Sequence, residues 1–156
     1  MNLRAVLKNP NERLRRKAKK VSVEDIHSPE IQTLIDDLIE TMQVENGVGI
    51  AATQIGSDKR VIIVDVNGVL PLINPEIVGK SLRKIEFEEG CLSVPGVTGI
   101  VKRHKEVKLK AYDRNGEPLT IHAKGLLAIV LQHETDHLDG ILFIDKVIRY
   151  TNPPRM

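Results

Sequence analysis

The sequence predicts an α+β fold: one domain of small antiparallel or mixed sheets packed around a central C-terminal helix, with an N-terminal helix covering the core. Length supports this, because 156 residues are a usual size for one domain, so residues 1–156 are taken together. Hydrophobic residues make up 41% of the chain but aromatic residues only 3%, which leaves Ile, Val and Leu to form the core. Helix-like and strand-like apolar patterns both occur, in different parts of the chain.

An N-terminal helix is expected between Ser28 and Asn46. Ser28 can cap its first turn, and Pro29 suits the first helical position. The apolar stripe of this helix consists of Ile31, Leu34, Ile35, Leu38 and Met42. The dipeptide Asn46-Gly47 is a usual helix end, and a glycine-punctuated loop is expected over residues 47–56.

Strands are expected between residues 60 and 88. Residues 60–66 are mostly apolar, which is typical of a buried strand, and the following Asn-Gly pair indicates a turn. Residues 72–73 and 76–78 are expected to be short extended pieces broken by Pro75. Residues 82–88 alternate only weakly between apolar and polar side chains.

A β-hairpin is expected before the C-terminal helix. Residues 106–112 alternate cleanly, with three apolar side chains on one face and two lysines on the other. The sequence Asp-Arg-Asn-Gly at residues 113–116 is typical of a turn. Residues 119–122 are therefore expected to pair with the preceding strand.

The segment from residue 126 to residue 137 is predicted to be the central helix. One of its faces carries Leu126, Val130, His133 and His137. Residues 126–131 are apolar nearly all round, which is typical of a buried helix. Gly125 precedes the helix, and Gly140 suits its end.

The motif His133-Glu134-Thr135-Asp136-His137 lies on this helix. Two imidazoles four residues apart share one face, so both can bind the same divalent metal ion. Glu134 then lies near a water molecule on that ion, as metal-assisted hydrolysis requires. The alternative is a buried helix whose histidines form ordinary hydrogen bonds.

Hydrolytic metal sites usually have three protein ligands, so a third ligand must exist if the motif binds metal. The chain has no His and no Glu after His137, and Phe143 stands where a metzincin has its third histidine. Asp139 and Asp145 are weak carboxylate candidates. A conventional zinc protease is therefore disfavoured, and the third ligand is expected upstream.

Cys91 is the best upstream candidate. It is the only cysteine in the chain, and it lies close after Glu88 and Glu89. Neighbouring carboxylates disfavour a thiolate unless a cation compensates, and a divalent metal ion is such a cation. The alternative is that Cys91 packs as a small buried hydrophobe.

Charge and composition exclude several other classes of protein. A net charge of +2 does not by itself indicate a nucleic acid partner, and the absence of Trp argues against base-stacking single-strand binders. The basic residues between positions 13 and 20 are expected to form a solvated face rather than an RNA patch. No apolar stretch has transmembrane length and no secretory signal is found, so no membrane partner is expected. A single cysteine allows no internal disulfide, which fits a reducing, cytoplasmic location.

Three segments together resemble the peptide deformylase family. They are residues 47–54 (GVGIAATQ), 89–93 (EGCLS) and 132–137 (QHETDH), in the order of the family's motifs. The resemblance covers nearly the whole chain and implies one catalytic domain that removes the formyl group from the N-terminal formylmethionine of new polypeptides, releasing formate.

The resemblance also implies a cofactor. Cys91, His133 and His137 would hold one divalent metal ion, with water as the fourth ligand. The native metal would commonly be Fe(II), and Zn, Ni or Co would be able to occupy the site. The C-terminal helix would then be a metal-binding helix.

Further roles follow from the same resemblance. Glu134 would act as general base, and the Gln54 side-chain amide and Leu92 backbone N–H would stabilise the oxyanion. The backbone of Gly49 would contact an extended peptide. The expected apolar slot for the methionine side chain is lined by Val48, Phe87, Leu126, Ile129 and Val130. Each of these five side chains is equally well explained as ordinary core.

N-formylmethionyl nascent peptides are the expected partners, with no sequence-specific nucleic acid. Ribosome association is expected to be weak at most, because Pro153 and Pro154 forbid the long C-terminal helix that docks some bacterial relatives on the ribosome. An ion pair of Glu89 with Arg103, with Asp136 as a further partner, is expected to orient the Cys91 segment. Two rival classes remain: an amidohydrolase or metallopeptidase acting on longer acyl groups, and a noncatalytic metal-binding module.

Overall fold

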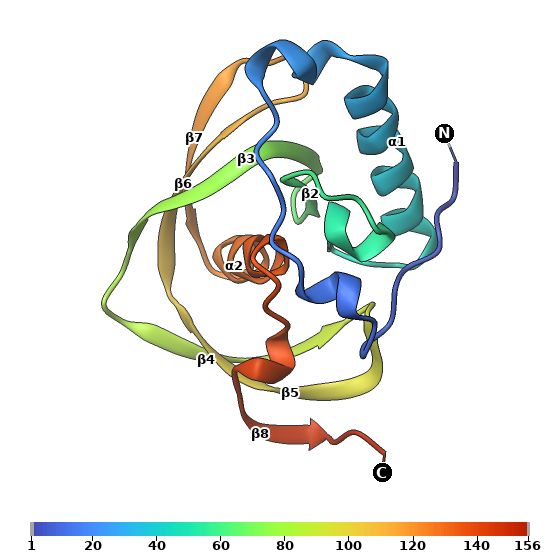
Figure 1. Ribbon diagram of the computed structural model, residues 1–156. Helices are drawn as coiled ribbons and strands as arrows, with labels where there is room; N and C mark the ends of the chain where they lie inside the picture. Colours follow the sequence, from blue (N-terminus) through green and yellow to red (C-terminus); the bar gives the residue numbers. More distant parts are fainter. Residues whose placement is uncertain (1, 156) are drawn as a thin grey trace.

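The computed structural model describes residues 2–155 (Figure 1). Its two α-helices are α1 (Pro29–Val44) and α2 (Leu126–Leu138). The strands are β1 (Gly49–Ala51), β2 (Val61–Asp65), β3 (Val69–Lys80), β4 (Lys84–Cys91), β5 (Val94–His104), β6 (Glu106–Tyr112), β7 (Pro118–Lys124) and β8 (Val147–Asn152). Short 3₁₀ turns cover Glu12–Arg15, Val23–His27, Ala52–Ile55 and Phe143–Asp145.

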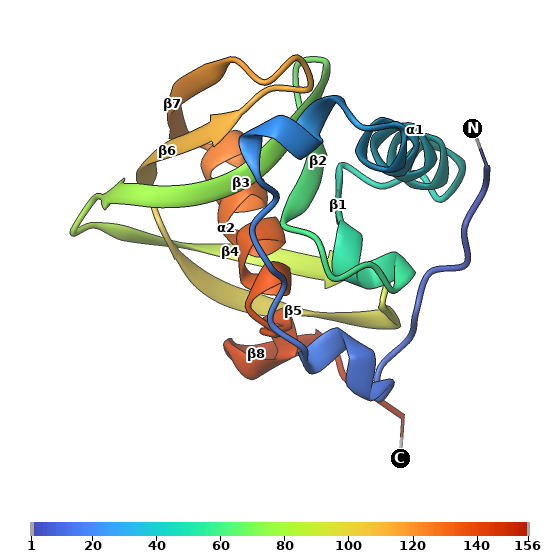
Figure 2. The ribbon, with the colours of Figure 1, turned by 45° about the horizontal axis from the view of Figure 1, so that its top comes forward.

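Two sheets enclose helix α2. Five strands pair in the order β1-β2-β3-β6-β7, and three pair in the order β4-β5-β8. In Figures 1 and 2, α2 runs through the space between the sheets, while α1 lies outside, beside β1 and β2. The α+β prediction is confirmed. All strand pairs in these sheets are antiparallel, and the described residues contain one isolated parallel bridge, between Lys19 and Lys59.

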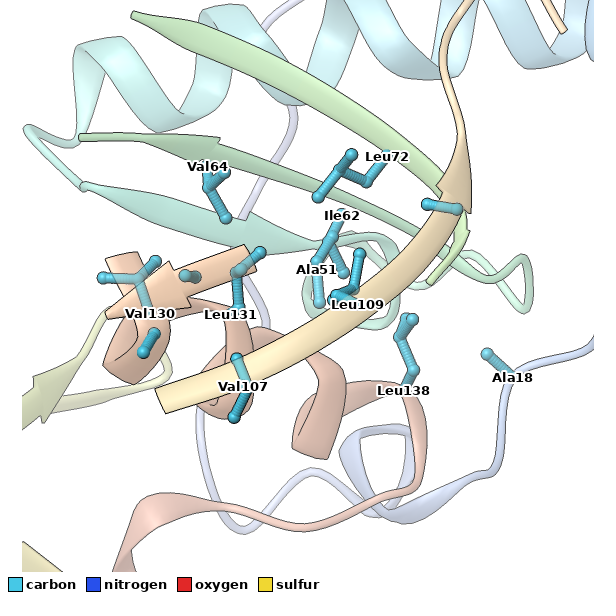
Figure 3. Packing of buried hydrophobic residues seen from close by; sticks show 13 residues of the cluster. Ala18, Ala51, Ile62, Val64, Leu72, Val107, Leu109, Val130, Leu131 and Leu138 are labelled. Carbon is cyan, nitrogen blue, oxygen red and sulfur yellow. The ribbon is translucent and has the colours of Figure 1, made fainter. Parts of the chain in front are cut away.

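The main core lies between α2 and the five-stranded sheet. Figure 3 shows Val130, Leu131 and Leu138 of α2 close to apolar side chains of β2, β3 and β6. This core contains aliphatic side chains only, as the scarcity of aromatic residues predicts. The prediction that α2 is buried on every side was wrong for its first residue, because Leu126 is 42% exposed.

Helix α1 begins where the sequence predicts. The Ser28 hydroxyl accepts a hydrogen bond from the Ile31 N–H at 3.3 Å, and Pro29 occupies the first turn. The predicted apolar stripe is buried and packs against β1, β2 and the turn Ala52–Ile55. The helix ends at Val44, and Asn46 adopts a positive φ of 56°.

The hairpin β6–β7 is also confirmed. Tyr112 pairs with Pro118, and the Asp113 carboxylate accepts hydrogen bonds from the N–H groups of Asn115 and Glu117. The apolar residues of β6 face the core and its lysines face outward.

Three strand predictions were wrong or incomplete. Strand β3 continues through Pro75, because a register shift between Ile73 and Glu76 forms a bulge that needs no donor from proline. The loop over residues 47–56 contains β1 and a 3₁₀ turn. Strands β5 and β8 were not predicted. They lack clear alternation, and β5 carries Pro95, Gly96 and Gly99, of which only Gly99 pairs with both β4 and β8.

No helix in the described part of the chain is both long and apolar enough to cross a membrane.

Candidate active site

Cys91, His133 and His137 meet at the centre of the molecule. Cys91 ends strand β4 of the smaller sheet, and both histidines lie on α2. One potential ligand atom from each residue lies within 4.8 Å of the others, and the Cys91 Sγ is 3.2 Å from the His137 Nε2. The structure therefore brings together the three residues that the sequence indicates as ligands.

The weaker candidates lie elsewhere. Asp139 forms an ion pair with Arg60 at 3.0 Å, and Asp145 forms one with Arg15 at 2.5 Å. Phe143 is buried, and its ring stacks on that of His133 with centroids 6.2 Å apart. The position that holds a ligand in metzincins therefore packs against one of the three candidate ligands here.

A buried ion-pair network lies next to the Cys91–His133–His137 cluster. The Arg103 guanidinium is 2% exposed and donates to both Glu89 carboxylate oxygens, at 2.8 and 2.9 Å. Its remaining Nη1 donates to Asp136 at 2.6 Å, and Lys146 pairs with the same carboxylate at 2.9 Å. The expected contacts of Arg103 with Glu89 and Asp136 are confirmed.

Glu89 connects this network to the cluster. Its Oε1 lies 2.8 Å from the His133 Nδ1, which leaves the Nε2 of that ring free to face the other two residues. Burial opposes the charge of Glu89, but hydrogen bonds from Arg103 and His133 outweigh it and lower its pKa to about 2. Glu89 therefore stays ionised at neutral pH.

The donor set fits a divalent transition metal. Catalytic zinc sites usually have three protein ligands and one open position, and imidazole nitrogen and thiolate sulfur are both ligands that zinc takes. Burial lowers the pKa of His137 well below its usual value, so this ring is neutral, as a ligand must be. Burial also lowers the pKa of His133, but the charge of Glu134 and contacts with Cys91 and Glu89 outweigh it and raise the pKa well above its usual value.

Glu134 lies in the same cleft, and its side chain is buried. Its Oε1 has no hydrogen-bond partner among residues 2–155. Burial raises the pKa of Glu134 to about 7. A Cβ added at Gly49 would lie 2.5 Å from the Glu134 Oε2, so only glycine leaves room there for this carboxylate.

Two amide donors approach the cluster from the turns that follow β1 and β4. The Gln54 Oε1 accepts a hydrogen bond from the Ala51 N–H at 2.9 Å, which orients the side chain. The Gln54 Nε2 then points to the Ser93 hydroxyl at 3.1 Å and the Cys91 Sγ at 3.6 Å. Leu92 follows Cys91, and within residues 2–155 its N–H donates to no side chain and to no loop carbonyl.

An open cleft of about 400 Å³ leads to these groups. Its walls include all six residues predicted to bind substrate, namely Val48, Gly49, Phe87, Leu126, Ile129 and Val130. Val48, Phe87 and Leu126 are at least 37% exposed, so they form the mouth of the cleft rather than core. Ile129 and Val130 are buried and form its inner wall.

Sequence reasoning missed one residue that lines this cleft and one buried residue behind it. Asn46, at the end of α1, lines it together with the predicted residues. Ser93 is fully buried and accepts a hydrogen bond from Gln54. Its place in the segment Glu89–Ser93 was the available signal, but a hydroxyl within a motif does not by itself indicate a contact with a distant amide.

Comparison with known proteins gives one consistent result. The family model described as "Polypeptide deformylase" matches residues 3–152. The peptide deformylase of Acetivibrio thermocellus is 50% identical over 157 residues, covering 100% of this chain and 90% of that protein. That of Thermoanaerobacter pseudethanolicus is 49% identical over 151 residues, covering 96% and 92%.

Solved structures agree with the sequence relatives. A class I type b peptide deformylase from Acinetobacter baumannii has a TM-score of 0.90 and 40% identity, covering 94% of this chain and 100% of that chain. A peptide deformylase from Legionella pneumophila has a TM-score of 0.88 and 44% identity, covering 94% and 86%. Because the family model matches nearly the whole of this chain, the chain belongs to the polypeptide deformylase family.

Proposed function

We propose that this chain removes the formyl group of N-formylmethionyl peptides at the Cys91–His133–His137 cluster, with Glu134 moving the proton. Peptide deformylases are hydrolases that remove the N-formyl group from nascent peptides, and this chain is one of them. The observation that carries the assignment of residues is the buried Glu134 carboxylate, which lines the same cleft as Cys91 and His133 and whose Oε1 has no hydrogen-bond partner among residues 2–155.

The three ligands would hold one divalent ion. When bound, it would act as a Lewis acid that activates water and polarises the formyl oxygen. Fe(II) is proposed as the native metal, and Zn, Ni or Co as ions that the same donors accept, because imidazole and thiolate suit all of them. Glu89 would hold the His133 ring in the orientation that leaves its Nε2 free.

Glu134 would act first as a base and then as an acid. A pKa of about 7 places it near the pH of the cell, where it can both take and give a proton. It would remove a proton from the attacking water as the new C–O bond forms at the formyl carbon. It would then deliver that proton to the nitrogen as the C–N bond breaks, giving formate and a free amine.

Gln54 and Leu92 would stabilise the negative charge that develops on the formyl oxygen. The Gln54 amide is held by the Ala51 N–H, so its orientation requires no rearrangement during the reaction. The Leu92 N–H provides a second donor from the loop after Cys91. Removing one such donor usually costs roughly 10²- to 10³-fold in kcat.

The peptide would lie along strand β1, with its methionine side chain in the apolar cleft. Ile129 and Val130 would contact the end of that side chain, and the backbone of Gly49 would contact the peptide. A deformylase from Acinetobacter baumannii, 37% identical with a TM-score of 0.90, has been solved with Met-Ala-Ser bound. A structurally similar deformylase therefore binds a peptide that begins with methionine.

An assay of formate release tests this function against the rival amidohydrolase class. Metal-loaded, anaerobically purified protein is expected to act on formyl-Met-Ala at least about 100-fold faster, in kcat/KM, than on acetyl-Met-Ala, because the added methyl group must fit beside the buried cluster. An internal peptide bond is expected to remain intact. If metal is present and no formate appears, the proposal is wrong, and preference for the acetyl or internal bond would favour the rival class.

We also propose a cytoplasmic location and weak ribosome association. The C-terminal segment forms strand β8, and the described residues contain no helix after α2 longer than the turn Phe143–Asp145. We propose that this contact depends on exposed charge, such as that of Arg16, Lys17 and Lys20. Co-sedimentation with ribosomes is expected to be partial and to disappear as salt rises. Binding that resists high salt would contradict this proposal.

A further inference from the structure

Three successive residues near the N-terminus bind the backbone of the catalytic loops. The Leu7 N–H donates to the Gln54 carbonyl at 2.7 Å, and the Asn9 N–H donates to the Ser93 carbonyl at 2.8 Å. Between them, the Lys8 ammonium donates to the Leu92 carbonyl at 2.8 Å. Segment 7–9 therefore connects the backbones of both proposed oxyanion donors.

These two donors belong to different sheets. Gln54 lies in the turn after β1 of the larger sheet, whereas Leu92 follows β4 of the smaller one. No ladder of backbone hydrogen bonds joins β1 to β4, so sheet pairing does not fix the distance between the donors. The Gln54 side chain reaches Ser93, and segment 7–9 adds a second, backbone-level connection. Misplacement by about 1 Å is enough to cost roughly 10²-fold in rate.

Lys8 has an additional effect through one peptide group. The carbonyl of Leu92 and the N–H of Ser93 belong to the same peptide unit. That N–H points at the Cys91 Sγ, 3.5 Å away. An ammonium group on the carbonyl oxygen polarises the peptide unit and strengthens its N–H as a donor, because hydrogen bonds in a chain reinforce one another. Lys8 thus touches the loop that carries both a metal ligand and an oxyanion donor.

We propose that Lys8 is a positioning residue for deformylation, which holds the Leu92–Ser93 peptide in the orientation that the reaction needs. This role rests on the proposed function of Gln54 and Leu92. The role would explain why the Lys8 ammonium binds the Leu92 carbonyl, which is 84 residues away in the sequence. Lys8 touches no reacting atom, and its side chain is exposed, so water screens its charge and its effect is smaller than that of a catalytic group.

Steady-state kinetics of three variants test the proposal. Lys8→Met keeps the aliphatic stem and removes the donor, and it is expected to lower kcat about five- to tenfold with KM changed less than about twofold, the scale of one lost hydrogen bond. Lys8→Arg restores a cationic donor and is expected to recover at least about half of the lost kcat. Lys17→Met changes an exposed lysine outside segment 7–9; it is the control and is expected to behave as wild type.

A second measurement reports on the peptide group itself. In the zinc-loaded protein, Lys8→Met is expected to shift the amide ¹⁵N resonance of Ser93, because its nitrogen is conjugated with the carbonyl that Lys8 contacts. Lys17→Met is expected to leave that resonance in place. Metal content and melting temperature are measured in parallel and are expected to match wild type.

Several results would overturn the role of Lys8. They are a kcat of Lys8→Met within about twofold of wild type, an equal loss in Lys8→Arg, or an unmoved Ser93 resonance. A fall in melting temperature or metal content that accounts for the lost activity would also refute it, in favour of a purely structural contact. Inactive wild-type protein would instead refute the proposed function, so the two failures are distinguishable.

Discussion

Glu134→Gln is expected to lower kcat for formyl-Met-Ala by roughly 10²- to 10⁴-fold, the usual contribution of a general base. The amide has nearly the same shape as the carboxylate, so the space beside Gly49 stays filled. It cannot take a proton from water or deliver one to the leaving nitrogen. Because Glu134 is not one of the three potential ligands, the metal content is expected to stay at the wild-type level.

Metal analysis and formate release on the same preparation make this test decisive. Glu45→Gln, an exposed residue just after α1, is a matched control and is expected to leave kcat unchanged. Near-normal turnover by metal-loaded Glu134→Gln would show that another group moves the proton. Loss of metal from the variant would show that Glu134 belongs to the metal site instead.

Local spacing predicted the helical half of the site. His133 and His137 are four residues apart on an amphipathic pattern, and a helix then places them on one face whatever surrounds it. Cys91 was reached differently, by the absence of any downstream His or Glu. This elimination indicated which residue is the third candidate ligand, but not where its sulfur lies relative to the histidines. That position depends on how β4 of the second sheet lies against α2.

Long-range pairing explains what sequence patterns missed. Strand β5 has Pro95 and Gly99 within its length, and either would normally end a strand. Gly99 pairs with Glu89 of β4 and Tyr150 of β8, and Pro95 follows Val94, which pairs with Cys91 of β4. Strand β3 passes Pro75 because its bulge places that residue where no donor is required. The extended conformations of β3 and β5 depend on strands that are distant in the sequence, so a short stretch of sequence is not enough to predict them.

The same limit applies to the cleft. Leu126 has the spacing of a core residue, but it starts the helix, where the chain leaves β7 and the sheet no longer covers it. The sequence left two readings open for Leu126, core contact and cleft lining, and its 42% exposure and its place in the cleft wall favour the second. Hydrophobic periodicity reports which face of a helix is apolar, but not where the covering sheet ends.

Arg103→Leu is expected to destabilise the protein by about 3–5 kcal/mol, the usual cost of breaking a buried ion pair from one side. Leucine would leave the Glu89 and Asp136 carboxylates without the guanidinium that bridges them. With Glu89 displaced or protonated, the His133 ring would lose its fixed orientation, so metal retention is expected to fall as well. Urea unfolding and metal analysis measure the two effects. Arg114→Leu, which breaks a partly exposed pair with Asp36, is the control and should cost at most about 1 kcal/mol.

The effect of Arg103→Leu should depend on pH in one direction. In the wild type, the pKa of Glu89 is lowered from 4.5 to about 2, so the stability from its charged form is complete above about 4.5 and disappears as the pH falls toward 2. In Arg103→Leu the main cause of that lowering is gone. The stability difference between the two proteins is therefore expected to be largest near neutral pH and to shrink below about pH 4.5. A difference that stays constant across this range would mean that Arg103 acts by packing alone, because only an interaction with an ionised carboxylate disappears when that carboxylate is protonated.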